Sequence, residues 1–164
     1  MTYEEVLSDL IDLLNRHHMI QTVGYGNLSD LVEPLKREPA VNQEGSDRLP
    51  NKIYGIDYPY AFINPTNHTL AKNASTYRFN LIMMEQCTDE TMEVIQAQSE
   101  CHQYIKDVLG HLYYNYDNKY DFNLNSSITP FKEKYNDTVS GMTAAIEVII
   151  RDPLDDCISP FEAK

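Results

Sequence analysis

The sequence predicts an α+β fold of two layers: an antiparallel sheet of about four strands with helices packed on one face, in the order α-β-β-(β)-α-β. Two patterns with helical spacing cover residues 3–18 and 88–115. Segments 53–63, 76–86 and 142–151 are rich in the aromatic and β-branched residues that favour strands. A long helix that leads into one late strand requires a sheet whose other strands come earlier, which gives the two layers.

Length and composition indicate one folded domain. The 164 residues are 42% hydrophobic, which is enough for a core. We expect a single domain over 1–152 and an extended C-terminal arm over 153–164, because Pro153 stops the last strand. A net charge of −12 argues against affinity for nucleic-acid phosphates, which requires Lys and Arg. The acidic start lacks a signal-peptide pattern, and no apolar run is long enough to predict a membrane span.

The first helix, over 3–18, is predicted from its N-cap and its apolar face. Thr2 precedes two glutamates, so a capping oxygen and acidic side chains lie at the positive end of the helix dipole. His17 and His18 fall in the last turn and point about 100° apart, which opposes a shared metal ion. The apolar face consists of Val6, Leu7, Leu10, Ile11, Leu13 and Leu14.

Glycine and proline break up residues 21–51, where we expect only a short helical turn over 28–35. Gly24 and Gly26 predict a turn, because a phosphate-binding loop would need a third glycine and a following Lys-Ser/Thr.

Two strands are predicted in the middle of the chain. Segment 53–63 is irregular because Gly55 and Pro59 interrupt it, and residues 64–69 read as a loop. Segment 76–86 alternates cleanly. One of its faces is apolar, while the other begins polar and becomes apolar, so we expect one end of that face to be covered. The two faces are Tyr77, Phe79, Leu81 and Met83, and Arg78, Asn80, Ile82 and Met84.

The long helix over 88–115 shows two apolar stripes, which is typical of a helix with two neighbours. One neighbour would be the sheet, and the other either an adjacent subunit or more of the same core. The main stripe is predicted as Met92, Ile95, Ser99, His102, Ile105, Leu109, Leu112 and Tyr116, and the weaker one as Val94, Cys101, Tyr104 and Val108.

A tyrosine-rich stretch and a polar spacer follow, then an extended or turn segment over 129–135 and the final strand over 142–151. That strand places five apolar side chains on one face, namely Met142, Ala144, Ile146, Val148 and Ile150.

The sequence carries no catalytic or metal-binding motif, so we expect no enzyme activity, no cofactor and no metal. Cys101 and His102 are adjacent but point to different faces of a helix. Carboxylates flank Cys87 and Cys101, and they would raise a thiol pKa, which is the wrong direction for a nucleophile. Structural zinc would need paired cysteine ligands that this chain lacks.

Three stretches support a resemblance. They are Tyr-Arg-Phe-Asn-Leu-Ile-Met-Met-Glu over 77–85, the helical segment 94–109, and Gly-Met-Thr-Ala-Ala-Ile-Glu-Val-Ile-Ile-Arg-Asp-Pro over 141–153 with Cys157 and Pro160. With the order helix, strands, long helix, strand and the Asn- and Tyr-rich composition, they resemble tail-terminator and tail-completion proteins of tailed bacteriophages. Among these, small ring proteins of crAss-like phages are similar. The resemblance covers most of the chain and lies in packing patterns.

The resemblance implies a structural virion protein of the neck or tail, assembled in the host bacterial cytoplasm. It implies a homo-oligomeric ring, six- or twelve-fold, that joins portal-side and tail-side rings around a channel through which DNA passes without specific binding. Strands paired edge to edge between protomers would remove exposed sheet edges. Acidic side chains facing the channel would repel DNA. Apolar and aromatic contacts would have to outweigh repulsion between the protomers, and the candidates are Tyr54, Tyr58, Tyr104, Val108 and Tyr113.

Two alternatives remain open. A small cytosolic enzyme would bring Cys101, His102 and His111 within about 3 Å of one another. A cytosolic binding module or a virion assembly chaperone would be absent from the mature particle.

Overall fold

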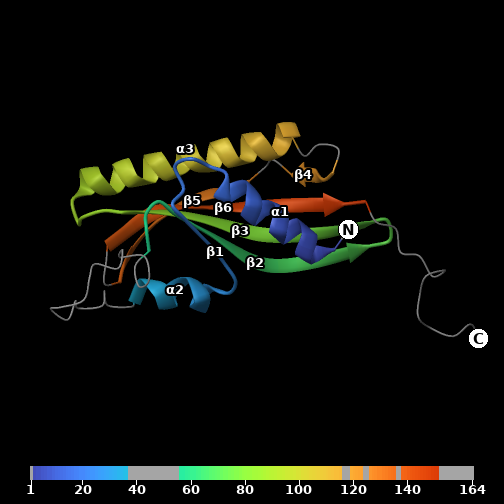
Figure 1. Cartoon of the computed structure of the whole chain (residues 1–164), viewed down its shortest axis with the longest axis horizontal. Coiled ribbons are helices and arrows are strands. Elements are labelled where there is room, and N and C mark those ends of the chain that lie inside the picture. The colour runs from blue at the N-terminus through green and yellow to red at the C-terminus, as the bar shows by residue number, and fades with distance from the viewer. Residues whose placement is uncertain (1, 37–55, 116–118, 124–125, 136–137, 152–164) are drawn as a thin grey trace, which may run out of the picture.

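The computed structural model describes residues 2–36, 56–115, 119–123, 126–135 and 138–151 (Figure 1). These residues form an α+β fold, as predicted, with three helices and a mixed sheet of six strands. The elements follow one another as α1 (Tyr3–Asn15), β1 (Thr22–Tyr25), α2 (Leu28–Lys36), β2 (Tyr60–Ala71), β3 (Ala74–Gln86), α3 (Thr91–Asn115), β4 (Asp121–Asn123), β5 (Ile128–Lys134) and β6 (Thr138–Ile150).

The sheet is larger than predicted and is not purely antiparallel. Its strand order is β1-β2-β3-β6, and β4 and β5 both pair with β6 on the side away from β3. β1 runs parallel to β2, and every other described pairing is antiparallel. β1 and β4 have four and three residues, too few to show an alternating pattern in sequence.

Helices cover both faces of the sheet, which corrects the prediction of two layers. α1 and α3 lie over one face and α2 lies under the other, at one end (Figure 1). The helix predicted over 28–35 is α2. None of the helices in the described ranges is long and apolar enough to cross a bilayer.

The main core lies between the sheet and the helices α1 and α3. The predicted faces of β3 and β6 are confirmed, since both point into this core. From the helices come Val6, Leu10, Leu13, Leu14, Ala97, Cys101, Tyr104, Ile105, Val108 and Leu112, and from the sheet Ala61, Ile63, Phe79, Leu81, Met83, Ala144, Ile146, Val148 and Ile150.

A second, smaller core explains why the other face of β3 changes from polar to apolar. Leu31 and Leu35 of α2 cover the end of the sheet that carries Ile82 and Met84. The expectation that one end of this face is covered is therefore confirmed.

The start of α1 follows its sequence signals closely. The Thr2 hydroxyl accepts a hydrogen bond from the Glu5 N–H at 3.3 Å, and the Glu5 carboxylate accepts one from the Thr2 N–H at 2.6 Å. This reciprocal capping box satisfies two N–H groups that a helix start otherwise leaves unpaired. The helix ends at Asn15, so His17 and His18 lie beyond it and the predicted end at 18 was three residues too far.

The prediction for α3 is only partly confirmed, because both stripes contribute to the main core. The predicted main stripe contributes Ile105 and Leu112. The supposed weaker stripe contributes Cys101, Tyr104 and Val108 to the core. Met92 and Ile95, placed in the main stripe, are 74% and 52% exposed. The sheet lies under the residues that recur from Ala97 through Cys101 to Leu112, while the first turns extend past it.

β2 continues through the residues predicted as a loop. It begins at Tyr60 and runs to Ala71, paired with β3 along most of its length. The Asn and Pro residues that suggested a turn are accommodated by a shift in the pairing register between Pro65 and His68. A long antiparallel ladder thus overrides a local turn signal.

Gly141 is required where β6 crosses the middle of the sheet. A Cβ atom at this position would lie 1.9 Å from the backbone oxygen of Met83. β3 and β6 can therefore approach closely only because this residue has no side chain.

Candidate functional site: an open strand edge

The outer edge of β2 is only half covered. β1 pairs with Tyr60 to Ile63 and then stops. Among the described residues, no strand lies beside residues 65–71 on the side away from β3. A strand edge of this kind presents backbone N–H and C=O groups to any extended segment that comes near. We call residues 65–71 the open edge.

A compact turn ends β1 and leaves this edge exposed. The Gly26 N–H donates to the Ile63 carbonyl at 3.1 Å, and the Asn64 side-chain amide donates to the Gly26 carbonyl at 3.0 Å. Gly26 has a φ of 132°, which a residue with a side chain rarely adopts. The Asn27 N–H then donates to the Asp30 carboxylate at 2.8 Å, and the chain turns away into α2. Gly26 therefore marks the turn that was predicted here, while Gly24 lies within β1.

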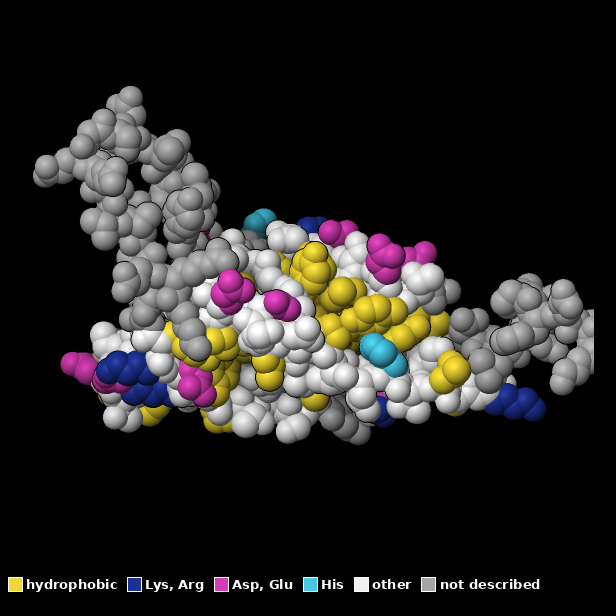
Figure 2. Space-filling model, turned by 90° about the horizontal axis from the view of Figure 1, so that it is seen from below, with side chains coloured by type: hydrophobic (Ala, Val, Ile, Leu, Met, Phe, Trp, Pro, Cys, Tyr) yellow, Lys and Arg dark blue, Asp and Glu magenta, His cyan; other side chains and the backbone are white. Residues whose placement is uncertain are grey.

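Apolar side chains follow α1 from the end of the helix that contacts the open edge. Tyr3, Leu7 and Ile11 recur every four residues along α1 and are half-buried against the core. Leu70 of β2 is 66% exposed. Figure 2 shows apolar side chains gathered into an elongated patch on the side of the molecule where α1 and β2 lie. We call Tyr3, Leu7, Ile11 and Leu70 the apolar strip.

An aromatic cluster fixes the start of α1 to the open edge. The Tyr3 ring lies 4.7 Å from the His68 ring and 6.0 Å from the Phe79 ring, between centroids. His68 in turn contacts Tyr77 edge-on at 5.1 Å. His68 and Leu70 are two residues apart in one strand and therefore share the helix side of the sheet. The strip and the edge thus form one surface.

The opposite side of this part of the sheet is polar. The Arg78 guanidinium donates to the Glu147 carboxylate at 2.6 Å and to the Thr69 hydroxyl at 3.0 Å. The Asn123 amide also donates to Glu147, at 2.9 Å. This hydrogen bond and the Arg78 charge outweigh burial and lower the pKa of Glu147. A strand added at the open edge would meet an apolar face on one side and a polar face on the other, which specifies its register.

The other outer edge of the sheet is protected. β5 carries Pro130, Lys132 and Lys134, and proline and lysine are the residues that blunt sheet edges against further pairing. Both lysines bind the Asp89 carboxylate, at 2.9 Å and 3.3 Å. Residues 65–71, by contrast, include no Lys, Arg, Asp or Glu. The open edge begins with Pro65 but carries no charged residue, so beyond Pro65 it is less protected against a further strand than β5 is.

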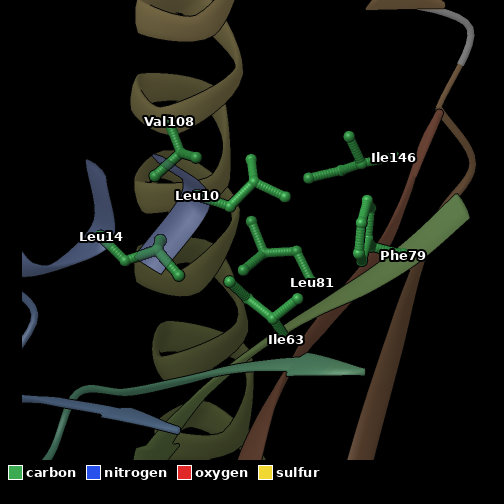
Figure 3. A pocket seen from close by; sticks show the side chains of 7 residues that line it. All are labelled: Leu10, Leu14, Ile63, Phe79, Leu81, Val108 and Ile146. Atoms are coloured by element: carbon green, nitrogen blue, oxygen red, sulfur yellow. The ribbon is translucent and has the colours of Figure 1, made fainter. Parts of the chain in front are cut away.

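A cavity inside the main core is too small and too apolar for a ligand. It lies where α1, α3 and the sheet meet, with a volume of about 10 Å³, which is room for about one water molecule (Figure 3). Every side chain around it is apolar: Leu10, Leu14, Ile63, Phe79, Leu81, Val108 and Ile146. We regard it as a packing defect.

A shallow cleft of about 370 Å³ lies between the end of α1 and α3. Its walls include His17, His18 and His111, and the His17 Nε2 lies 3.7 Å from an Asp107 carboxylate oxygen. No group of three or more His, Cys, Asp or Glu side chains in the described residues is arranged to hold a metal ion. The cleft has the size of a ligand pocket. Its described lining does not by itself identify a ligand.

The cysteine and histidines proposed for an enzyme site are dispersed. Cys101 is fully buried in the main core, while His102 is exposed and His111 lines the cleft. Burial raises the pKa of the Cys101 thiol to about 12, and the Glu85 and Glu100 charges act in the same direction. The structure therefore does not bring Cys101, His102 and His111 together.

The residues expected at an oligomer interface differ in how accessible they are. Tyr104 and Val108 are buried in the chain's own core, which leaves little of either for a neighbouring subunit. Tyr58 is half-buried against the second core, and Tyr54 lies outside the described residues. Tyr113 is 47% exposed and packs edge-on against Tyr114, with the ring centroids 5.1 Å apart. Of the five, Tyr113 offers the most surface.

The open edge itself was missed in the sequence, because Asn64, Pro65 and Asn67 read as a loop. Two signals point to it in retrospect. Tyr3 falls on the same helical line as Leu7 and Ile11, at the margin of the apolar face of α1. Thr69 and Leu70 then have strand propensity just before the hairpin turn.

Comparisons with known proteins assign no family to this chain. No protein-family model matches the chain, and no curated protein matches it.

Proposed function

We propose that this chain is a structural subunit of a homo-oligomeric ring in the head-to-tail connector of a tailed bacteriophage. In that position it joins portal-side and tail-side rings around the DNA channel. The observation that carries the proposal is the contrast between the two sheet edges. One edge is blunted by Pro130, Lys132 and Lys134, while the open edge has no Lys, Arg, Asp or Glu and lies beside the apolar strip, which is half-buried on α1 and exposed at Leu70. An edge left in this state is suited to pairing with another chain.

The charge of the chain supports the same role. A net charge of −12 disfavours adhesion to DNA, so a channel formed by such subunits would let DNA slide. At physiological salt the repulsion extends only about 8 Å, so it acts on DNA close to the wall.

The resemblance of segments 77–85, 94–109 and 141–153 to phage ring proteins supports the virion neck or tail as the location. The partners are copies of the same chain, six or twelve in a ring, and the neighbouring portal, ring or tail proteins.

Mass spectrometry of purified phage particles tests the location. The ring subunit is expected in the mature particle at six or twelve copies per particle, with the portal protein as the internal reference for the count. Absence from particles that contain the portal and tail proteins would reject the structural role.

A virion assembly chaperone or cytosolic binding module is the second candidate, and the open edge favours it too, because an edge can hold a partner's strand transiently. The same measurement separates the two. The chaperone is expected in infected cells and in immature particles, but not in finished ones.

A further inference from the structure

We propose that the open edge receives the C-terminal segment of a neighbouring copy as an added strand formed by residues 157–163. This inference rests on the proposed ring function and identifies the contact that would link one protomer to the next. Three observations support it: the position at which the described chain ends, the length that follows, and the chemistry of that segment.

The described chain ends close to the open edge. Ile150 pairs with Ser75, and Ser75 pairs with Leu70, so these three residues form one row across the sheet. Neighbouring strands lie about 4.8 Å apart, which places the end of β6 roughly 10 Å from the start of the hairpin that bounds the open edge. The segment therefore leaves one protomer at the end of the sheet where the next would receive it.

The length that follows is sufficient. Thirteen residues come after Arg151 in the sequence, and fully extended they span up to about 43 Å. The open edge has seven residues and is about 24 Å long at the rise of a strand. About half of the segment can bridge two protomers while the other half pairs.

The chemistry of the segment matches the site. Residues 157–161, Cys-Ile-Ser-Pro-Phe, form an uncharged run within an otherwise acidic segment, and the open edge is uncharged as well. In an extended strand Cys157 and Phe161 point to the same side, where the apolar strip would receive them. Pro160 lacks an N–H, which is tolerated in a strand that becomes the new outer edge.

The proposed ring function places the receiving edge on a neighbouring copy. Each copy would then give a strand at one end and receive one at its open edge. Such a head-to-tail contact repeats around an axis and closes a ring when the rotation fits.

Photo-crosslinking in the full-length protein tests the inference. Phe161 is replaced by a photoreactive phenylalanine, and copies with normal and heavy nitrogen are mixed before assembly and irradiated. Mass spectrometry is expected to find crosslinks from position 161 to peptides containing residues 65–71 or Tyr3 and Leu7, in pairs of mixed isotope. Crosslinks within single copies only, crosslinks to β5, or no crosslinks would each overturn the inference.

Two variants sharpen the test. Leu70→Lys places a charge on the apolar strip and is expected to lower the crosslink yield about tenfold, without unfolding the chain, because Leu70 is mostly exposed. Met92→Lys changes an apolar residue of α3 that is also mostly exposed and should leave the yield unchanged. Equal yields in the two variants would contradict the role of the strip.

A ring found in particles whose crosslinks map elsewhere would reject this contact and leave the ring function standing. Crosslinks at the open edge in a protein absent from particles would reject the ring function instead.

Discussion

The role of a single residue is clearest where burial or a close backbone contact restricts which side chain can occupy the position. Cys101 is the clearest case, because the core surrounds it and nearby carboxylates oppose its ionisation. Its side chain contributes to packing, and its thiol stays protonated at neutral pH.

Cys101 is therefore expected to resist alkylation in the native protein. With its pKa raised to about 12, almost none of the reactive thiolate is present at pH 8. Iodoacetamide labelling, read by peptide mass spectrometry, should leave Cys101 unmodified until the protein is unfolded in urea. Cys87 is a useful internal comparison because it is only half-buried. Equal labelling of Cys101 in native and unfolded protein would contradict its place in the core.

Gly141→Ala is expected to destabilise the protein by about 1–3 kcal/mol, because the new methyl group would meet the Met83 carbonyl and force β3 and β6 apart. Urea unfolding followed by circular dichroism measures this difference. Gly110→Ala is the matched control, since an added Cβ there meets no atom within 4 Å. In the helix α3 this control should be neutral or stabilise the fold by up to about 1 kcal/mol. The reverse order of the two variants would contradict the described packing.

Individual elements are held by a few specific contacts in addition to the core. α1 is tied to the chain that follows α3 by Asp9, whose carboxylate accepts hydrogen bonds from the Tyr120 hydroxyl and the Lys119 ammonium. Burial raises the pKa of Asp9, but these two hydrogen bonds and the Lys119 charge together more than offset it, and the net effect is a lowered pKa.

Asp9→Asn is expected to reduce stability at pH 7 by about 1–3 kcal/mol, the usual cost of disrupting hydrogen bonds to a charged group. A carboxyl whose folded pKa is lowered stabilises the fold above its unfolded pKa of about 4, and that contribution is lost as pH falls through the folded value. The difference between wild type and variant should therefore shrink as urea unfolding is repeated from pH 7 down to pH 3. A difference that stays constant with pH would show that the charge of Asp9 does not contribute.

Elements with strong alternation or clear end signals could be predicted from the sequence. The capping oxygen of Thr2 and the two glutamates after it predicted the start of α1, and the alternating residues of β3 and β6 predicted their core faces. These signals are local, because each depends only on residues a few positions apart.

The remaining elements depend on contacts between distant segments. Residues 64–69 form a strand because β3 pairs with them, and β1 forms because Gly24 lets the side chains of Tyr60 and Phe62 lie against it. Residues from both predicted stripes of α3 are buried in one core, and only the position of the sheet decides where along the helix this burial begins. The open edge depends on where β1 stops, so it could not be recognised before the pairing was known.

At the scale of the whole molecule, strand pairing and apolar contact favour association while charge opposes it. Each copy carries −12, so assembled copies repel one another. Salt shortens the range of this repulsion from about 10 Å at 0.1 M to about 3 Å at 1 M.

Self-association is therefore expected to increase with salt. Analytical ultracentrifugation of the protein in 0.05 M and 0.5 M NaCl should show a shift toward larger species at the higher concentration. Dissociation at high salt would indicate that opposite charges hold the copies together, which is not expected for an uncharged edge and an apolar strip.

Under the proposed function, the most direct measurement is a symmetry-resolved electron-microscopy map of the neck of the phage particle in which this chain would be assembled. We predict a closed ring of six or twelve copies around the DNA channel, with each open edge paired to an adjacent subunit. A neck fully built from other proteins, with no density for this fold, would contradict the proposed function.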